Sequence, residues 1–368
     1  MNKNQNISKI LVVGQTPPPF GGQATVIKKI IDAKYINIKI YHVRMSFSKE
    51  MSQIGSFNFY KLIHLFQIIY EIYLMKFRFK INTLFYPPSG PDRNPIVRDI
   101  IILFCTRWLF HRIIFQFFAG GISDYYKNAS KIEKYFMRKV YFGPDITLRP
   151  SIYSPNDGIS FNTKKDIILS WGVDDNYNAD LRIRKQVVNI LFVGVLRDSK
   201  GIMVLLAACR RLKMNHIDFE LNILGDFYSE DIQKRILEFL EMDDLNQCIH
   251  FHGVRTGNSY YKHFYEADIF CFPTFFESEN LPVVLLDAAK FGLPIISTKW
   301  RSIPSVVDQE VNGFLVEIKN DKQIYEKLKL LIENYELRIE MGSKSRQKYL
   351  EKFDNKVFIK ELEKILEG

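Results

Sequence analysis

Short apolar runs alternate with segments of helical periodicity along the whole chain. Residues 10–13 form a run with the length and β-branched content of a buried strand. Residues 23–33 place apolar side chains three and four positions apart, as amphipathic helices do. The predicted strands are 10–13, 38–43, 82–86, 113–118, 145–148 and 167–169, then 188–193, 219–224, 249–252, 269–272, 294–297 and 313–316. Strands that alternate with helices predict an α/β fold with parallel sheets.

The pattern restarts after residues 174–185, which are polar and lack periodicity. A chain of 368 residues has the length of about two domains. We therefore predict two Rossmann-like domains in series with a cleft between them, residues 1–176 and residues 186–350. Residues 351–368 are expected to form a C-terminal helix that packs back on the N-terminal domain.

Composition and charge narrow the class of protein. Hydrophobic residues make up 47% and charged residues 25%, values of a globular chain and not of a disordered one. Residues 1–176 hold 24 Lys and Arg against 12 Asp and Glu, whereas residues 177–368 hold 27 against 29. The basic excess of the first half suggests an anionic partner: a membrane surface, nucleic acid or a phosphorylated substrate. The alternative is a solvated basic face that has no partner.

The sequence favours a cytoplasmic protein without a bound metal. No spacing among the four cysteines suggests zinc, so we expect buried reduced thiols. Residues 1–8 are polar and do not resemble a signal peptide. The most apolar stretch, residues 100–118, is broken by Arg107, His111 and Arg112, so no transmembrane helix is expected.

The richest chemistry follows the predicted strand 269–272. Asn280 is a good N-cap and Pro282 a good first-turn residue, so a helix is expected to start there. Loops at the carboxyl ends of parallel strands bind ligands, and a helix N-terminus suits a phosphate. Glu279 lies in this loop, and Asp287 lies about 9 Å further along the helix at 1.5 Å per residue. Two carboxylates at that separation suit hydroxyls at opposite ends of a diphosphate; the alternative is a helix that carries ordinary surface acids.

This stretch resembles the donor-binding signature of family-4 glycosyltransferases, which have the two-domain GT-B fold. The family pattern is Glu, seven residues and Glu; Glu279 and Asp287 hold that spacing, with Asp in the second place. The flanking matches are ADIF at 267–270, LP at 281–282, GLPII at 292–296, IP at 303–304 and NG at 312–313. The resemblance implies that Glu279 holds the donor sugar and Asp287 the ribose. It also places Asn280, Leu281 and Pro282 among the donor-binding residues.

A second match begins where the strand 188–193 ends in Gly194. Lys200-Gly201 then opens a helix, as in the family's strand–loop–helix. Val195 stands where the family commonly has Arg, and Arg197 is the candidate replacement. Two cations at a helix N-terminus stabilise a diphosphate leaving group without a metal ion. No Asp-x-Asp triplet occurs, so a metal-bound nucleotide is not expected; the alternative for Lys200 is an ordinary surface lysine.

Three further glycine-containing segments match the family more weakly. Residues 14–22, GQTPPPFGG, resemble a Pro-Pro-Pro-Tyr-Gly-Gly loop that touches the donor across the cleft, which makes Gly21 and Gly22 candidates. A generic tight turn is the alternative there. Gly225 and Gly253 end strands of the second domain, and the resemblance implies that backbone near Val254 reads the nucleobase.

The N-terminal half departs from the family. Gln116 and Phe118 stand where the family often has His-x-His, so the role of that histidine is not carried over. The family's Pro-Asn-Gly-Val-Asp hinge reads SWGVD at 170–174. The donor half therefore matches the family, while the acceptor half is unusual. The histidines at 111, 252 and 263 are expected to be core or surface residues.

The basic half also contains an aromatic segment, residues 58–80. The cations counted with it are Lys61, Lys76, Arg78, Lys80, Arg107, Arg112, Lys131, Lys134, Arg138 and Lys139. A basic, aromatic surface docks on anionic lipid headgroups. The alternative is that the aromatic face packs on the sheet. No recognised nucleic-acid motif is present, so nucleic acid is not expected as a partner.

The resemblance implies a retaining, metal-independent glycosyltransferase of the hexosyltransferase type. It would move a sugar from a nucleoside diphosphate sugar to a hydroxyl of a lipid-linked saccharide in the synthesis of lipopolysaccharide, capsule or a similar polysaccharide. It would work without a cofactor in the cytoplasm, at the inner face of the cell membrane. Two alternatives stay open. One is another GT-B enzyme, a non-hydrolysing sugar-nucleotide epimerase or a phosphorylase, and the other is a non-catalytic protein that binds nucleotide sugars or membranes.

Overall fold

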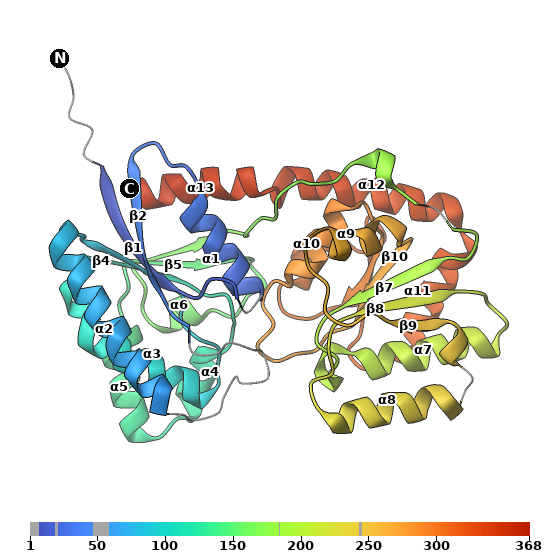
Figure 1. Cartoon of the computed structure of the whole chain (residues 1–368), viewed down its shortest axis with the longest axis horizontal. Coiled ribbons are helices and arrows are strands. Elements are labelled where there is room, and N and C mark those ends of the chain that lie inside the picture. The colour runs from blue at the N-terminus through green and yellow to red at the C-terminus, as the bar shows by residue number, and fades with distance from the viewer. Residues whose placement is uncertain (1–6, 19–20, 47–58, 184, 243–244) are drawn as a thin grey trace, which may run out of the picture. The chain divides into compact units, whose positions relative to one another are not determined.

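The computed structural model describes residues 7–18, 21–46, 59–183, 185–242 and 245–368 (Figure 1). The chain divides into two compact units: residues 1–172 with 355–368, and residues 173–354. Residues 174–176 and 351–354 thus belong to the second unit. The reason is local, since Val173 N donates to Phe353 O at 3.0 Å and Tyr349 OH donates to Val173 O at 2.8 Å.

The first unit is built on a parallel sheet. Its strands are β1 (Ser8–Gly14), β2 (Ile38–Arg44), β3 (Thr83–Tyr86), β4 (Arg112–Gln116), β5 (Ile146–Arg149) and β6 (Lys165–Ile168), in the order β2-β1-β3-β4-β5-β6. All their pairings are parallel. Each of the six predicted strands is present, with its ends within two residues of the prediction. The helices are α1 (Gly22–Asp32), α2 (Phe59–Phe79), α3 (Arg93–Thr106), α4 (Ile122–Asn128), α5 (Lys131–Tyr141), α6 (Asp157–Ser160) and α13 (Asn355–Glu367).

Helices α2, α3 and α5 lie side by side along the sheet of the first unit (Figure 1). Their inward side chains, such as Ile72, Leu103 and Val140, join a core that includes Leu84 and Phe115 of the strands. Helix α5 begins in a capping box that satisfies its free N–H groups. Glu133 N donates to Ser130 Oγ at 3.2 Å, and Ser130 N donates to Glu133 Oε2 at 3.0 Å.

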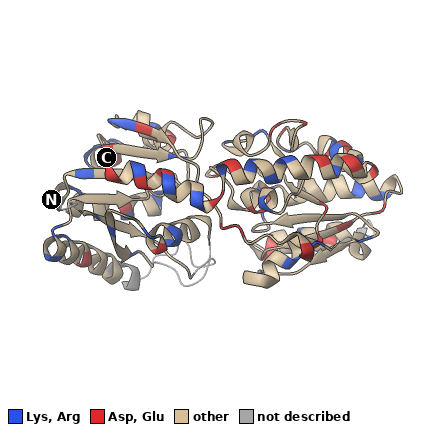
Figure 2. Ribbon diagram, turned by 90° about the horizontal axis from the view of Figure 1, so that it is seen from above, with Lys and Arg blue, Asp and Glu red and all other residues tan. Residues whose placement is uncertain are grey.

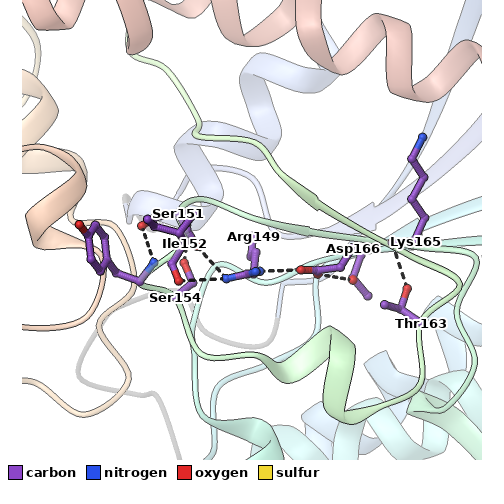
Figure 3. A network of polar contacts seen from close by, with 9 residues as sticks. Arg149, Ser151, Ile152, Ser154, Thr163, Lys165 and Asp166 are labelled. Carbon is purple, nitrogen blue, oxygen red and sulfur yellow. Dashed lines mark hydrogen bonds and ion pairs between the residues drawn. The ribbon is translucent and has the colours of Figure 1, made fainter.

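A polar network ties the last two strands of this sheet together (Figure 3). Asp166 of β6 accepts from Arg149 Nε at 2.6 Å and from Thr147 Oγ1 at 2.7 Å. The same guanidinium donates to the carbonyl of Ser151 at 3.1 Å. These contacts fix the loop that follows β5.

Helix α13 belongs to the first unit although it comes last in the chain. Arg112 donates to the carbonyl oxygens of Ile365 and Leu366 at 2.7 and 2.8 Å. Ile36 N donates to Glu363 Oε1 at 2.6 Å. Among the helices that the structure describes, none is long and apolar enough to cross a membrane.

The second unit repeats the parallel arrangement. Its strands are β7 (Asn189–Val193), β8 (Glu220–Leu224), β9 (Ile249–Phe251), β10 (Ile269–Phe272), β11 (Ile295–Thr298) and β12 (Gly313–Val316), in the order β12-β11-β10-β7-β8-β9. The helices are α7 (Ile202–Met214), α8 (Glu230–Met242), α9 (Gly257–Glu266), α10 (Val283–Lys290), α11 (Asp321–Glu333) and α12 (Tyr335–Lys352). The two-domain α/β prediction is confirmed. Strand order reverses where β7 pairs with β10, and such a point is where doubly wound sheets bind ligands.

Candidate functional site

The loops after β7 and β10 touch each other at this reversal point. Phe275 N donates to Ser199 O at 2.8 Å. A Cβ atom on Gly201 would lie only 2.1 Å from the carbonyl oxygen of Pro273, and the φ of Gly201 is +80°. Glycine is therefore required for both the close approach and the left-handed backbone. The Lys200-Gly201 pair is the sequence element that lets the two loops meet.

Lys200 and Glu279, both predicted to be catalytic, form an ion pair across these loops. Their side chains are 16% and 12% exposed, so the pair is partly shielded from water. Thr274 Oγ1 also donates to Glu279 Oε2, at 3.3 Å. The structure thus brings a cation and a carboxylate together at the carboxyl edge of the second sheet, where the sequence predicted a binding site for the sugar donor.

Arg197 lies beside this pair, held between two aromatic rings. Its guanidinium carbon is 4.5 Å from the ring centre of Tyr228 and 4.7 Å from that of Phe276. Lys200 Nζ lies 4.6 Å from the same Phe276 ring. Cation–π attraction therefore holds both cations on one ring. No sequence motif marks Phe276 and Tyr228, so the sequence did not predict their role. Their contacts with Arg197 join loops that lie far apart in the chain.

The loop that carries Glu279 is held by the segment after β11. Trp300 Nε1 donates to Phe276 O at 2.9 Å, and Arg301 donates to Glu277 O at 2.9 Å. Ser302 N donates to Asn280 O at 3.2 Å. These bonds pre-position the carboxylate loop. The available signal in the sequence was Trp300, two residues after the end of β11.

The prediction that Asn280 caps the next helix is wrong. Helix α10 begins at Val283, and its N-cap is Pro282, with φ −65° and ψ 120°. The Asn280 side chain is buried and accepts a hydrogen bond from Ser302 Oγ at 2.9 Å instead. Leu281 is also buried, at 3% exposure. Asp287 consequently lies five residues from the N-cap, or about 7.5 Å along the helix, and not 9 Å.

Asp287 is held inside the second unit by two partners. Tyr260 OH donates to Asp287 Oδ2 at 2.9 Å, and Lys290 Nζ lies 2.9 Å from Oδ1. Lys290 is fully buried, with the Tyr261 ring centre 4.4 Å from its ammonium group. Burial, and then the Asp287 charge, raise the pKa of Tyr260 well above its ordinary value, so the phenol stays a donor. Each carboxylate oxygen keeps a further lone pair for a ligand hydroxyl.

The predicted strand-end glycines form a close-packed edge beside these loops. Gly194 N donates to Leu224 O at 2.9 Å, and Gly225 N donates to Gly253 O at 3.0 Å. A Cβ atom on Gly225 would lie 1.9 Å from Gly194 O, so only glycine fits. Val254, next along the chain, is 64% exposed. Backbone at this edge is accessible to a planar ligand.

The candidates of the first unit lie in a different environment. Gly21 is the N-cap of α1, and no atom lies within 4 Å of the place where its Cβ would be. Gly22 is the first residue of that helix. In the preceding loop, Pro18 O accepts from Arg44 at 2.8 Å, and residues 19–20 lie outside the described residues. The donor-binding role of Gly21 and Gly22 stays a prediction.

The residues that replace the histidine pair are buried. Gln116 is 1% exposed, and neither amide atom has a hydrogen-bond partner among the described residues. Phe118 packs on Trp171 with ring centres 5.0 Å apart, and Trp171 Nε1 also lacks a partner there. The amide at the end of β4 therefore has no partner among the described residues, whereas the buried Asp157 carboxylate nearby accepts from Gly121 N at 2.9 Å and Ser123 N at 2.8 Å.

The remaining histidines and cysteines form no ligand set. His252 lies beside His263 with ring centres 4.4 Å apart, and its Nε2 is 2.6 Å from Asn222 Oδ1. Loss of solvation lowers both pKa values, that of His263 to about 4. Cys209 and Cys271 are buried, and all four cysteines are free. Across the described ranges, no three metal-ligating side chains gather in one place.

Comparison with known families finds a similarity in the second unit. Residues 173–348 match the family model described as glycosyl transferases group 1. The matched residues include Lys200, Glu279, Arg197 and Asp287, and they coincide closely with the second unit.

Curated relatives match part of the chain. An uncharacterized glycosyltransferase of Haemophilus influenzae is 33% identical over 158 residues, 43% of this chain and 43% of the relative. The amylovoran biosynthesis glycosyltransferase AmsK of Erwinia amylovora is 30% identical over 154 residues, 40% of this chain and 37% of the relative. The matches thus span about two fifths of the length of these relatives.

Solved structures match the whole chain and show its fold. Anabaena HepE in complex with UDP superposes with a TM-score of 0.72 at 14% identity, covering 98% of this chain and 99% of that one. The same protein in complex with UDP-glucose gives a TM-score of 0.72 at 13% identity, over 98% and 99%. With two parallel sheets in the observed order, the fold is GT-B, as the resemblance implied.

Proposed function

We propose that this protein is a retaining glycosyltransferase that moves a hexosyl group from a nucleoside diphosphate sugar to a hydroxyl of a growing cell-surface polysaccharide. The observation that carries the proposal is the Lys200–Glu279 pair, with Arg197 beside it, at the point where strand order reverses. The name of AmsK and the UDP and UDP-glucose complexes of HepE support the substrate class.

The charges suggest how the donor is held. Lys200 and Arg197 would bind the diphosphate, and Glu279 would then accept hydrogen bonds from the sugar hydroxyls. Asp287 would accept from the ribose hydroxyls, with the backbone at Gly253 and Val254 against the base. Tyr228 and Phe276 hold Arg197, and Gly201 lets the two loops meet, before any ligand binds. Charge stabilisation needs this pre-organisation.

The proposed reaction breaks the bond between the anomeric carbon and the diphosphate oxygen. The acceptor oxygen forms its bond on the same face of the sugar, and its proton passes to the departing diphosphate. Negative charge grows on that leaving group, where Lys200 and Arg197 stabilise it electrostatically. We propose that these cations take the place of a metal ion and that no other cofactor takes part.

The acceptor is proposed to be a saccharide linked to a lipid, used at the inner face of the cell membrane. The support is the charge distribution, because the basic excess lies in residues 1–176. A lipid-linked acceptor carries phosphate and stays in the bilayer, so a basic domain gains from lying on that surface.

Calorimetric titration with UDP, GDP, ADP and CDP in the presence of EDTA tests the donor site. We expect one nucleotide to bind, and Lys200→Ala to weaken that binding at least tenfold. Lys213→Ala is the matched control, because Lys213 is an exposed cation on α7, the helix that Lys200-Gly201 precedes. Its affinity should equal that of the wild type.

If none of the four nucleotides binds, the donor assignment is wrong and a non-catalytic role replaces it. If one nucleotide binds, product analysis separates the enzyme classes. An epimerase turns over the donor alone, a phosphorylase requires free phosphate, and a transferase requires a saccharide acceptor.

A further inference from the structure

Helix α2 carries apolar side chains on two faces. Leu65, Ile68 and Ile72 are at most 5% exposed and pack into the core of the first unit. A second stripe faces solvent: Ile63 is 43% exposed, Phe66 61%, Tyr70 68%, Leu74 43% and Phe77 64%. The spacing of three and four residues places these five on one side of the helix. The core explains the first stripe and leaves the second without an internal partner.

Exposed aromatic side chains continue across the neighbouring helices. Phe104 of α3 is 51% exposed, Trp108 of the following turn 69% and Tyr135 of α5 58%. Ring contacts join the helices, with Tyr73 of α2 6.3 Å from Trp108 and Phe104 5.7 Å from Phe136. We define the aromatic band as Phe66, Tyr70, Phe77, Phe104, Trp108 and Tyr135. Exposed apolar side chains that gather on neighbouring helices are typical of an interaction surface.

A groove of about 770 Å³ opens beside the band, with Phe104 and Trp108 in its wall. His111 and Lys139 line the same groove, and both are exposed. Lys164 in its wall is paired with Asp145 at 2.7 Å. The groove therefore joins aromatic surface to basic side chains, the combination that suits a phosphate headgroup next to an apolar chain.

Two of the basic residues that the sequence analysis grouped with the aromatic segment bind backbone carbonyls inside the protein. Arg107 donates to the carbonyl oxygens of Val140 and Phe142 at the end of α5, the latter at 2.6 Å. Arg112 donates to the carbonyls of α13. Each neutralises the negative end of a helix. The side chain of Lys61 lies outside the described part of the chain.

The exposed charges that remain around the band are mostly basic. Arg78 lies in the last turn of α2, Lys80 follows that helix, and Lys131, Arg138 and Lys139 are exposed on α5. The one acid of α5, Glu133, is paired with Arg93 at 2.9 Å. Figure 2 shows Lys and Arg along the elements of the first unit. The surface is thus apolar at its centre and basic at its border.

We propose that the aromatic band docks on the anionic surface of a lipid bilayer. The rings would enter the boundary between headgroups and acyl chains, where aromatic side chains are favoured. The basic border would then face lipid phosphates, with one headgroup in the groove at Lys139. A second copy of the chain fits less well, because a symmetric dimer through this face would bring like charges together. The proposal rests on the proposed function only for its purpose, access to a lipid-linked acceptor.

Vesicle binding by the full chain tests the proposal. The test compares vesicles of phosphatidylcholine alone with vesicles that contain about 30 to 40% phosphatidylglycerol, an anionic lipid. Flotation in a density gradient measures how much protein each kind of vesicle binds. We expect binding to the anionic vesicles only, which weakens as salt rises. The variant Phe66→Ser/Tyr70→Ser/Trp108→Ser should bind at least tenfold more weakly. All three side chains are more than 60% exposed, so the fold should persist.

Matched controls lie in the second unit. Met214→Ser/Leu237→Ser/Tyr335→Ser removes three apolar side chains that are 69%, 43% and 45% exposed. It should bind vesicles like the wild type. Nucleotide affinity, measured on every variant, should stay unchanged, so a failure of the donor site is distinguished from a failure of the band.

Three results would overturn the proposal. The wild type could fail to bind anionic vesicles, or the band variant could bind them as tightly as the wild type does. The third is a wild-type dimer in solution that the band substitutions convert to monomer, since a second copy would then cover this surface.

Discussion

The carboxyl edges of the two parallel sheets differ in how their polar groups are held. In the second unit, Lys200 pairs with Glu279 and Asp287 pairs with Lys290, so each buried or half-buried charge has a partner. In the first unit, the edge residue Gln116 is buried with no hydrogen-bond partner in the described structure. Both sheets are parallel, but the second presents paired charges at its carboxyl edge. The first holds an amide without a partner among the described residues, near the buried Asp157 carboxylate, which accepts from Gly121 N and Ser123 N. We infer that the side chains at each edge, more than the parallel sheet beneath them, determine which ligand binds.

Breaking the buried pair of the second edge should give the largest effect. Lys290→Met removes a fully buried cation and leaves the Asp287 charge with one hydrogen bond, from Tyr260. Loss of one partner of a buried pair costs about 3–5 kcal/mol. We expect the free energy of unfolding of the second unit, measured in urea, to fall by that amount.

The double variant Asp287→Asn/Lys290→Met tests whether the lost stability comes from the unpaired charge of Asp287. It removes both charges, so most of the lost stability should return. Lys262→Met is the surface control, because its side chain is 67% exposed. If Lys290→Met has the same urea midpoint of unfolding as the wild type, the ion pair does not stabilise the position of Asp287. The contrast between the two carboxyl edges would then be weaker than proposed.

Glu279→Gln should cause the next largest effect, on turnover. The amide keeps the shape of the carboxylate but loses the charge that pairs with Lys200 and that we propose accepts from the sugar hydroxyls. Loss of one pre-organised electrostatic contact costs about 10²–10³-fold in turnover, or about 2.7–4 kcal/mol. Initial rates with saturating donor measure it, and circular dichroism checks the fold. Glu277→Gln, two residues away and exposed, is the matched control; equal rates for both variants would refute the role of Glu279.

The sequence predicted the strands well because buried parallel strands are continuous apolar runs. The sequence placed Lys200 and Glu279 in one donor-binding site but did not predict that they pair, because the pairing depends on β7 and β10 lying side by side in the sheet. It did not predict the start of α10, because Asn280 binds Ser302, and that choice depends on tertiary contact. Nor could periodicity show that Lys290 is buried, since a lysine in a helix reads as a surface residue.

The first edge is tested by Gln116→Leu. Removal of a buried polar group without a partner should stabilise the protein by about 1–2 kcal/mol, because an unmet amide costs about 1–3 kcal/mol. Urea unfolding measures the change. If Gln116 binds the acceptor, transfer should also slow while nucleotide affinity stays constant.

Asn189→Leu is the opposite case, in the second unit. Asn189 is equally buried, but its amide donates to Glu266 O at 2.9 Å and its Oδ1 accepts from Asn222 at 2.7 Å. This substitution should therefore destabilise the protein. A loss of stability in Gln116→Leu as well would mean that Gln116 has a water partner in solution, and the two buried amides would be alike in this respect.

The smallest effect should come from Trp300→Phe, which tests whether neutral hydrogen bonds hold the carboxylate loop. The substitution keeps an aromatic ring and removes the bond from Nε1 to Phe276 O. One such bond is worth about 1 kcal/mol, so we expect the KM for the donor to rise about fivefold with little change in kcat. Trp108→Phe is the control: Trp108 is 69% exposed in the first unit, and its kinetics on a soluble acceptor should match the wild type. An unchanged KM in Trp300→Phe would mean that Arg301 and Ser302 hold the loop without it, so that pre-organisation of this edge is shared among several bonds.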